Sequence, residues 1–189
     1  MAQRRLRASI RKVTPLYSGF LKVNRYEIEA EKHGGGFVTV ALEVMERGHA
    51  VAVLGYDPVR DEVVLVNELR AGELAAGDYP FGEALVAGGI GGDETPIDAA
   101  IREMKEETGL ELRDPQLVHP GAYVSPGGTS EKVAIVFGTV DTSRAGGVHG
   151  NRNEHEDILT VVLPAQELID RARRGEISDL KTLFAAYWL

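Results

Sequence analysis

The sequence predicts an α/β domain that is preceded by a small β-rich N-terminal element. Two apolar, β-branched runs, at 49–56 and 62–69, have the length of strands and are joined by the turn sequence DPVRD. A well-capped helix follows over 95–109, and strand and helix patterns then alternate to the end of the chain. The 189 residues are enough for one domain with a sizeable core.

The N-terminal element shows short β-type alternation over 4–30, broken at Pro15 and Gly19. The glycines of KHGGG at 32–36 predict a turn, because glycine tolerates positive φ. A strand is expected to begin at Phe37. The two strand-like runs that follow form a hairpin-like pair, and the Gly- and Ala-rich stretch 70–82 predicts a loop.

The helix over 95–109 has the strongest local signals in the chain. Thr95 is the expected N-cap, Pro96 suits the first helical position and Gly109 suits the C-terminal end. The stripe expected to pack on the sheet is Ile97, Ala100, Ile101 and Met104. Strands are predicted at 131–140 and 158–163 and helices at 165–175 and 178–189, the last with a buried face of Leu180, Leu183, Phe184, Tyr187 and Trp188.

The composition excludes several classes of protein. The chain has no cysteine, so disulfides, thiolate catalysis and cysteine zinc sites are ruled out, and we expect a cytoplasmic location. The formal net charge of −8 argues against nucleic acid as a partner, and no apolar run is long enough to cross a membrane. The basic segment 1–26 lacks the hydrophobic stretch of a secretory signal. It is either a solvated strand face or an arm that pairs with an acidic surface of its own core or of a second subunit.

Three glutamates crowd the C-terminal half of the helix. Glu103 and Glu107 are four residues apart and Glu106 is three from Glu103, so their charges repel. In a partly buried cleft, two unit charges about 5 Å apart repel by roughly 3 kcal/mol, and a divalent cation reverses the sign. Mg²⁺ takes oxygen ligands and suits carboxylates that also present a phosphate. The alternative is a solvated acidic face with Arg102 and Lys105 as local partners.

The stretch 88–110, GGIGGDETPIDAAIREMKEETGL, resembles the Nudix box without a gap. The matching positions are Gly88, Glu94, Arg102, Glu103, Met104, Glu106, Glu107, Gly109 and Leu110. The resemblance implies an αβα sandwich with a mixed sheet over 46–189, and metal-dependent hydrolysis of a nucleoside diphosphate linked to another moiety, with Mg²⁺ or Mn²⁺ as cofactor. It also implies site roles: Glu103 and Glu107 are metal ligands, Glu106 is a ligand or electrostatic partner, Arg102 orients the glutamates, and the carbonyl of Ala87 is a further ligand.

Four further segments resemble the ADP-ribose pyrophosphatase branch of that family. They are ERGHA at 46–50, DPVRDEVVL at 57–65, SPGGTSE at 125–131 and GVHGNRNEHEDI at 147–158, and Pro126 lies sixteen positions after the box, as in that branch. The resemblance implies conversion of ADP-ribose and water to AMP and ribose 5-phosphate. Hydrolysis of another nucleotide sugar such as GDP-mannose, or a non-catalytic nucleotide-sugar sensor, stays open. The usual glutamate before the Ala-Gly pair is displaced by one residue, so Glu83 receives no role.

The acidic loop NRNEHED is the expected source of the base. Breaking a phosphoanhydride needs an in-line water, a group that takes its proton and cations that neutralise the phosphates. By the same resemblance Glu154 is the candidate base and Glu156 a metal ligand, on a loop that can close over bound substrate. His149 and His155 compete for the proton transfer, and a solvated acidic loop is the alternative for Glu154.

Other residues are expected to bind the substrate. Arg70 is a candidate phosphate clamp, because guanidinium forks suit phosphate oxygens, or else an exposed charge at a strand end. Ser125 and Glu131 are expected to bind the terminal ribose, and Phe20 to stack on adenine unless it is a core residue. In related enzymes the N-terminal β element crosses to a second subunit. The resemblance therefore implies a homodimer in which 1–45 is the dimerisation element and Phe20 acts in trans.

Overall fold

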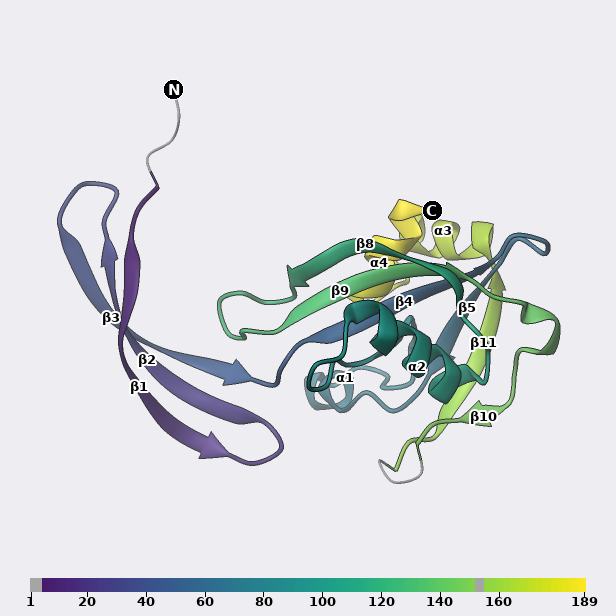
Figure 1. Ribbon diagram of the computed structural model, residues 1–189, viewed down its shortest axis with the longest axis horizontal. Helices are drawn as coiled ribbons and strands as arrows, with labels where there is room; N and C mark the ends of the chain where they lie inside the picture. Colours follow the sequence, from purple (N-terminus) through teal and green to yellow (C-terminus); the bar gives the residue numbers. More distant parts are fainter. Residues whose placement is uncertain (1–4, 152–154) are drawn as a thin grey trace. The chain divides into compact units, whose positions relative to one another are not determined.

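A computed structural model of the chain describes residues 5–151 and 155–189 (Figure 1). The chain divides into two compact units, the first comprising Met1–Gly48 and Tyr123–Lys132 and the second His49–Ala122 and Val133–Leu189. Tyr123–Lys132 joins the first unit because backbone hydrogen bonds connect Met45 to Gly128 and Ser130, at N···O distances of 2.9 and 3.2 Å. The division at residue 45 drawn from the sequence stays a prediction.

The first unit contains a three-stranded antiparallel sheet in the order β1-β2-β3, with bounds Ala8–Ser18, Lys22–Glu31 and Phe37–Glu46. One face of this sheet carries the charges, and cross-strand ion pairs hold it together. They are Arg7–Glu31, Arg11–Glu29, Lys12–Glu27 and Arg25–Glu43. Basic side chains of the N-terminal segment thus pair with acidic residues of their own sheet.

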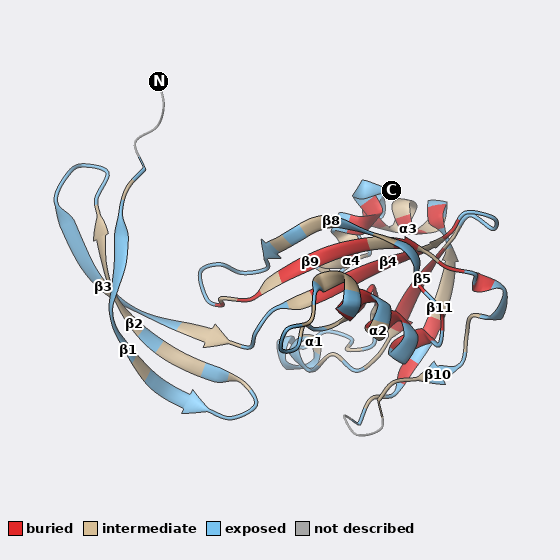
Figure 2. Ribbon diagram, in the orientation of Figure 1, coloured by how far each residue is buried: buried red, intermediate tan, exposed pale blue. Residues whose placement is uncertain are grey.

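The other face of the β1-β2-β3 sheet is apolar. The register aligns Ile10 with Ile28 and Ile28 with Val40, and the next row ends at Leu42. Ile10 keeps 60% and Leu42 49% of its surface exposed, and the strands of this unit are coloured as exposed or intermediate in Figure 2. A face of this composition has the character of an interaction surface.

The second unit is built on an eight-stranded sheet. Six strands follow the order β10-β11-β5-β4-β9-β8, while β6 pairs with β5 and β7 with β4. Because β4 runs parallel to β9 and antiparallel to β5, the sheet is mixed. The strands are β4 (Ala50–Asp57), β5 (Glu62–Asn67), β6 (Glu83–Ala84), β7 (Val86–Gly89), β8 (Arg113–Tyr123), β9 (Lys132–Thr139), β10 (Val148–His149) and β11 (Ile158–Pro164).

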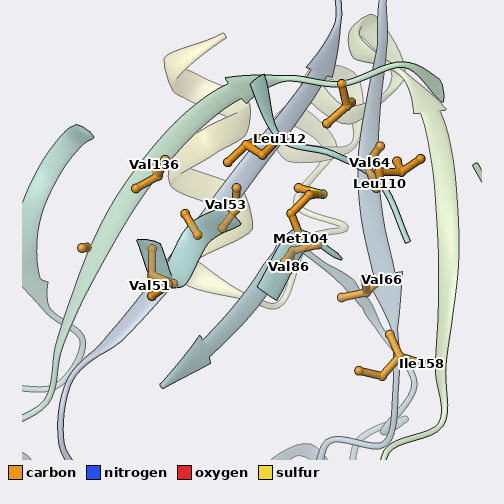
Figure 3. Packing of buried hydrophobic residues seen from close by; sticks show 14 residues of the cluster. Val51, Val53, Val64, Val66, Val86, Met104, Leu110, Leu112, Val136 and Ile158 are labelled. Atoms are coloured by element: carbon orange, nitrogen blue, oxygen red, sulfur yellow. The ribbon is translucent and has the colours of Figure 1, made fainter. Parts of the chain in front are cut away.

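Helices cover both faces of this sheet, so its central strands are buried on both sides (Figures 1 and 2). The helices of this unit are α1 (Ala71–Ala76), α2 (Pro96–Thr108), α3 (Ala165–Arg174) and α4 (Leu180–Trp188), with a 3₁₀ turn η1 (Thr142–Arg144), and those that pack on the sheet are α2, α3 and α4. Alternate residues of β4 point to opposite faces. Val53 packs with Met104 of α2, whereas Leu54 packs with Leu168 of α3, and Figure 3 shows Met104 close to the valines of the first of these clusters.

The predicted caps of α2 are present, but its buried side differs from the prediction. The Thr95 side chain accepts a hydrogen bond from the Asp98 N–H at 3.2 Å, and Gly109 ends the helix with φ of 71°. Ile101 is 41% exposed and Ile97 is only half-buried. The residues that face the sheet are Ala99, Ala100, Glu103, Met104, Glu107 and Thr108. The helix is therefore rotated so that two box glutamates, and not Ile101, point inward.

Three other expectations from the sequence were wrong or incomplete. The stretch 70–82 contains the short helix α1, and β8 had not been predicted. On α4 the buried residues are Thr182, Ala185 and Ala186, whereas Leu180 and Tyr187 are 57% and 64% exposed. Across the described ranges, every helix is too short or too polar to cross a membrane.

Candidate metal centre

Two box glutamates lie against the strand that precedes their helix. Glu103 and Glu107 are buried on the side of α2 that packs on β7. At Gly88 of β7, a Cβ atom would lie 1.8 Å from Glu103 Oε1. Any side chain at this position would occupy the space of the carboxylate, which explains why the box begins with glycine.

Arg102 connects the loop before α2 to the glutamates. Its Nε and Nη2 donate to the two carboxylate oxygens of Glu94 at 2.9 and 3.0 Å, and Nη2 also donates to the Gly89 carbonyl at 2.9 Å. Its Nη1 donates to Glu103 Oε1 at 2.6 Å and to Glu106 Oε2 at 3.2 Å. A guanidinium fork can make all of these bonds at once, and an ammonium group cannot. Arg102 therefore fixes both the loop, through Glu94, and two of the three glutamates on α2.

Glu107 is the most deeply buried carboxylate of this group, with 3% of its surface exposed. Its Oε2 has no hydrogen-bond partner among the described residues. Burial, followed by the charges of Glu68 and Glu103, raises the pKa of Glu107 to about 9, against which a hydrogen bond from the Ala87 N–H acts. Burial also raises the pKa of Glu103, although Arg102 opposes this.

The loop before β11 brings one further carboxylate to the group. Glu156 Oε2 accepts a hydrogen bond from the Asn151 N–H at 2.8 Å, and the charge of Glu156 acts on both Glu103 and Glu107. The candidate base Glu154 lies outside the described residues. His149 contacts the Gly146 carbonyl through Nε2 at 2.9 Å and would touch a side chain at Gly109, so it lies at the C-terminal end of α2. His155 is exposed with φ of 58°.

Arg70 lies just beyond β5 and is not an exposed strand-end charge. Its guanidinium Nη2 is 3.1 Å from Glu68 Oε1, and both side chains are about three-quarters buried, at 26% and 24% exposure. The charge of Glu68 acts on Glu107, and Glu68 was not among the site residues predicted from the sequence. A carboxylate two residues before the arginine in NELR was the available signal.

The three expected contacts to the nucleotide sugar belong to the first unit, whereas the glutamates belong to the second. Phe20 is 97% exposed in the β1–β2 turn, so it is not a core residue. The Ser125 carbonyl accepts hydrogen bonds from two backbone N–H groups of its turn. Glu131 is buried and lies 3.5 Å from Arg47 Nε. Glu83, which received no role, pairs with Arg171 of α3.

The donor set suits a hard divalent cation. Within 5–151 and 155–189, no three histidine or acidic side chains are already gathered as a metal-binding set, and Arg102 instead engages Glu103 and Glu106. A buried carboxylate oxygen without a hydrogen bond, beside other carboxylates, nevertheless favours a cation over any neutral ligand. The space that Gly88 leaves for Glu103 keeps a second carboxylate on the same buried side of α2.

The family model for the NUDIX domain matches residues 46–184. The chain belongs to the Nudix family. The ADP-ribose pyrophosphatase of Escherichia coli (strain K12) is 37% identical over 175 residues, which cover 92% of this chain and 83% of the relative. The ADP-ribose pyrophosphatase of Haemophilus influenzae (strain ATCC 51907 / DSM 11121 / KW20 / Rd) is 32% identical over 179 residues, with coverages of 92% and 82%.

Relatives of lower identity to this Nudix protein are named for another substrate. The GDP-mannose pyrophosphatase of Cronobacter sakazakii (strain ATCC BAA-894) is 29% identical over 170 residues, which cover 89% of this chain and 87% of the relative. A crystal structure of an ADP compounds hydrolase superposes with a TM-score of 0.74 at 21% identity and covers 98% of this chain and 94% of that one. The expected Nudix fold and the resemblance to the ADP-ribose pyrophosphatase branch are thereby confirmed. The roles of the individual site residues stay predictions.

Proposed function

We propose that this Nudix protein is a divalent-metal-dependent hydrolase that converts ADP-ribose and water to AMP and ribose 5-phosphate. The observation that carries the proposal is the buried carboxylate of Glu107. Its Oε2 has no hydrogen-bond partner among the described residues, and the charges of Glu68, Glu103 and Glu156 act on it. Such a carboxyl either keeps its proton or, in its charged form, needs cations to neutralise it. The relatives named ADP-ribose pyrophosphatase, at 37% and 32% identity, support this choice of diphosphate substrate.

The proposed roles follow from the contacts of each residue. Glu103, Glu107, Glu156 and the Ala87 carbonyl would hold the Mg²⁺ or Mn²⁺ ions. Bound there, the ions would neutralise the diphosphate and lower the pKa of a nucleophilic water. Arg102 keeps Glu103 and Glu106 in place through its bonds to the preceding loop. Arg70 would donate to a phosphate oxygen, and Glu154 would take the proton of the attacking water.

Substrate turnover tests the proposal. The purified protein is incubated with Mg²⁺ and either ADP-ribose or GDP-mannose, in water labelled with ¹⁸O, and the products are identified by mass. We expect AMP and ribose 5-phosphate, with the label on one of the two phosphates to report which phosphorus is attacked. The Glu107→Gln variant should lose at least about a hundredfold in rate. Absence of turnover by a folded, metal-loaded sample would favour the nucleotide-sugar sensor.

GDP-mannose is the second candidate substrate, because relatives at 27–29% identity are named GDP-mannose pyrophosphatases. Equal or faster turnover of GDP-mannose in the same assay would replace ADP-ribose as the assigned substrate. Ser125 and Glu131, which we propose bind the terminal sugar, would then be the first positions to substitute. We also propose a cytoplasmic location, which the cysteine-free composition favours.

We also propose that the chain forms a homodimer through the apolar face of the β1-β2-β3 sheet, with Phe20 stacking on adenine in the partner's site. The exposure of Ile10 and Leu42 supports an interface there. Leu42→Lys should shift the sedimentation coefficient to that of a monomer. Ala41→Lys is the matched control, because Ala41 lies on the charged face opposite Glu27, and it should leave the dimer intact.

A further inference from the structure

The end of strand β3 binds the segment 125–131 within the first unit. Because β3 lies at the edge of the β1-β2-β3 sheet, its outer backbone groups are available to a further partner. Met45 forms an isolated parallel bridge with Thr129. In this bridge the Met45 N–H donates to the Gly128 carbonyl at 2.9 Å, and the Ser130 N–H donates to the Met45 carbonyl at 3.2 Å. The segment therefore extends the N-terminal sheet by one bridge at its edge.

The side chain of Glu46 adds a second connection between the same two segments. One of its carboxylate oxygens accepts a hydrogen bond from the Tyr26 hydroxyl of β2 at 2.5 Å, and the other accepts from the Ser130 hydroxyl. Hydrogen bonds to an ionised acceptor are stronger than those between neutral groups. Glu46 thus joins the middle strand of the sheet to the segment 125–131.

The segment that Glu46 contacts is a tight turn, and its two ends carry the residues proposed to bind the terminal sugar. The Ser125 carbonyl accepts from the N–H groups of Gly128 and Thr129, each at 3.0 Å. Thr129 is buried, and its hydroxyl accepts from the Glu131 N–H at 3.1 Å. Since Ser130 lies between Thr129 and Glu131, a bond that fixes Ser130 acts on both ends of the turn.

Glu46 is the side chain at the end of β3 that a substitution can test most clearly. The bonds of Met45 are made by its backbone, so a change of side chain does not remove them. Arg47 Nε lies 3.5 Å from Glu131 Oε1, and the arginine side chain is 49% exposed, so this ion pair contributes little. Glu46 is half-buried and uses both oxygens.

We propose that Glu46 is a positioning residue that sets the turn 125–131 for the terminal sugar of the substrate. The proposal rests on the proposed function, because it takes Ser125 and Glu131 as the groups that bind this sugar. Glu46 acts on them through Ser130. Loss of Glu46 should therefore weaken a ligand that has the terminal sugar and spare a ligand that lacks it, whereas loss of a residue that only stabilised the fold would affect both ligands alike.

Isothermal titration of the full-length protein in EDTA, which prevents metal-dependent hydrolysis, measures this difference. The two ligands are ADP-ribose and AMP, which lacks the terminal ribose 5-phosphate. Glu46→Ala should bind ADP-ribose about tenfold more weakly than the parent and AMP equally well. Glu46→Gln keeps two polar atoms that can bond both hydroxyls, so its affinities should stay within about threefold of the parent. Glu43→Ala, which removes a carboxylate of the same strand that pairs with Arg25, is the matched control and should change neither affinity.

Steady-state kinetics and a second variant complete the test. With Mg²⁺, Glu46→Ala should raise the KM for ADP-ribose about tenfold and leave kcat within about twofold. Ser130→Ala guards against a folding defect, because it removes only the hydroxyl at the other end of the bond. It should reproduce the loss of ADP-ribose affinity, and the double variant should bind no more weakly than Glu46→Ala alone, since both changes remove the same interaction.

Two results would overturn the proposal: an equal loss of affinity for ADP-ribose and AMP in a folded variant, or an unchanged ADP-ribose affinity in both Glu46→Ala and Ser130→Ala. If the affinities shift as expected but the parent does not hydrolyse ADP-ribose with Mg²⁺, the role of Glu46 stands and the proposed function fails. If the parent and both variants hydrolyse ADP-ribose with the same KM, the proposed function stands and the role of Glu46 fails.

Discussion

Glu107→Gln should stabilise the metal-free protein at neutral pH. The pKa of Glu107 is raised from an ordinary value of 4.5 to about 9, so the folded chain keeps at pH 7 a proton that the unfolded chain loses. The stability that Glu107 contributes is therefore fully present below pH 4.5, and the free energy of unfolding falls as the pH rises toward 9. Each pH unit above 4.5 lowers the free energy of unfolding by about 1.4 kcal/mol, which amounts to roughly 3 kcal/mol at pH 7. Glutamine has the same shape and no such penalty.

Denaturant unfolding in EDTA at pH 5 and pH 7 measures this effect. The free energy of unfolding of the variant should exceed that of the parent by about 3 kcal/mol at pH 7 and by less than about 1 kcal/mol at pH 5. In excess Mg²⁺ the order should reverse, because only the parent gains binding energy from the ion. A difference between parent and variant that is independent of pH, or a variant less stable than the parent in EDTA at pH 7, would show that the folded chain does not hold Glu107 in its protonated form.

Three other substitutions have defined outcomes. Gly88→Ala places a Cβ 1.8 Å from Glu103 Oε1 and should weaken Mn²⁺ binding more than about tenfold by titration, while Gly91→Ala, which meets no atom within 4 Å, should not. Arg102→Lys loses the fork that joins the loop to the glutamates and should lower kcat about tenfold to a hundredfold in steady-state assays. Thr182→Val removes the acceptor of a buried backbone N–H and should cost about 1–3 kcal/mol in urea unfolding without altering KM.

The fold was predictable where the signal is local. The caps of α2 depend on residues within a few positions of each other, and the apolar runs of β4 and β5 follow from burial on both faces. The buried side of α4 is not local. Its Thr182 hydroxyl accepts from the Leu85 N–H of a distant segment, which turns this side of the helix inward although larger apolar residues lie beside it. Likewise Ile101 stays exposed because Glu103 and Glu107 occupy the inner face of α2.

The candidate site shows the same division. Arg102 and its glutamates lie within one helix, so their spacing alone indicated that they share a site. The contribution of Glu68 depends on the pairing of β5 with β11, which no spacing along the chain reveals. The ion pair of Arg70 with Glu68, by contrast, joins residues two positions apart, so the sequence NELR did carry a signal for it.

Binding of Mn²⁺, followed by electron paramagnetic resonance, tests most directly whether the buried glutamates hold divalent cations. We expect the parent protein to remove free Mn²⁺ from solution at neutral pH, Mg²⁺ to displace the bound Mn²⁺, and added pyrophosphate to tighten Mn²⁺ binding. Glu103→Gln should lose this binding and Glu111→Gln should keep it. Equal Mn²⁺ binding by the parent and Glu103→Gln, or none by a folded parent with pyrophosphate present, would mean that these glutamates do not hold divalent cations.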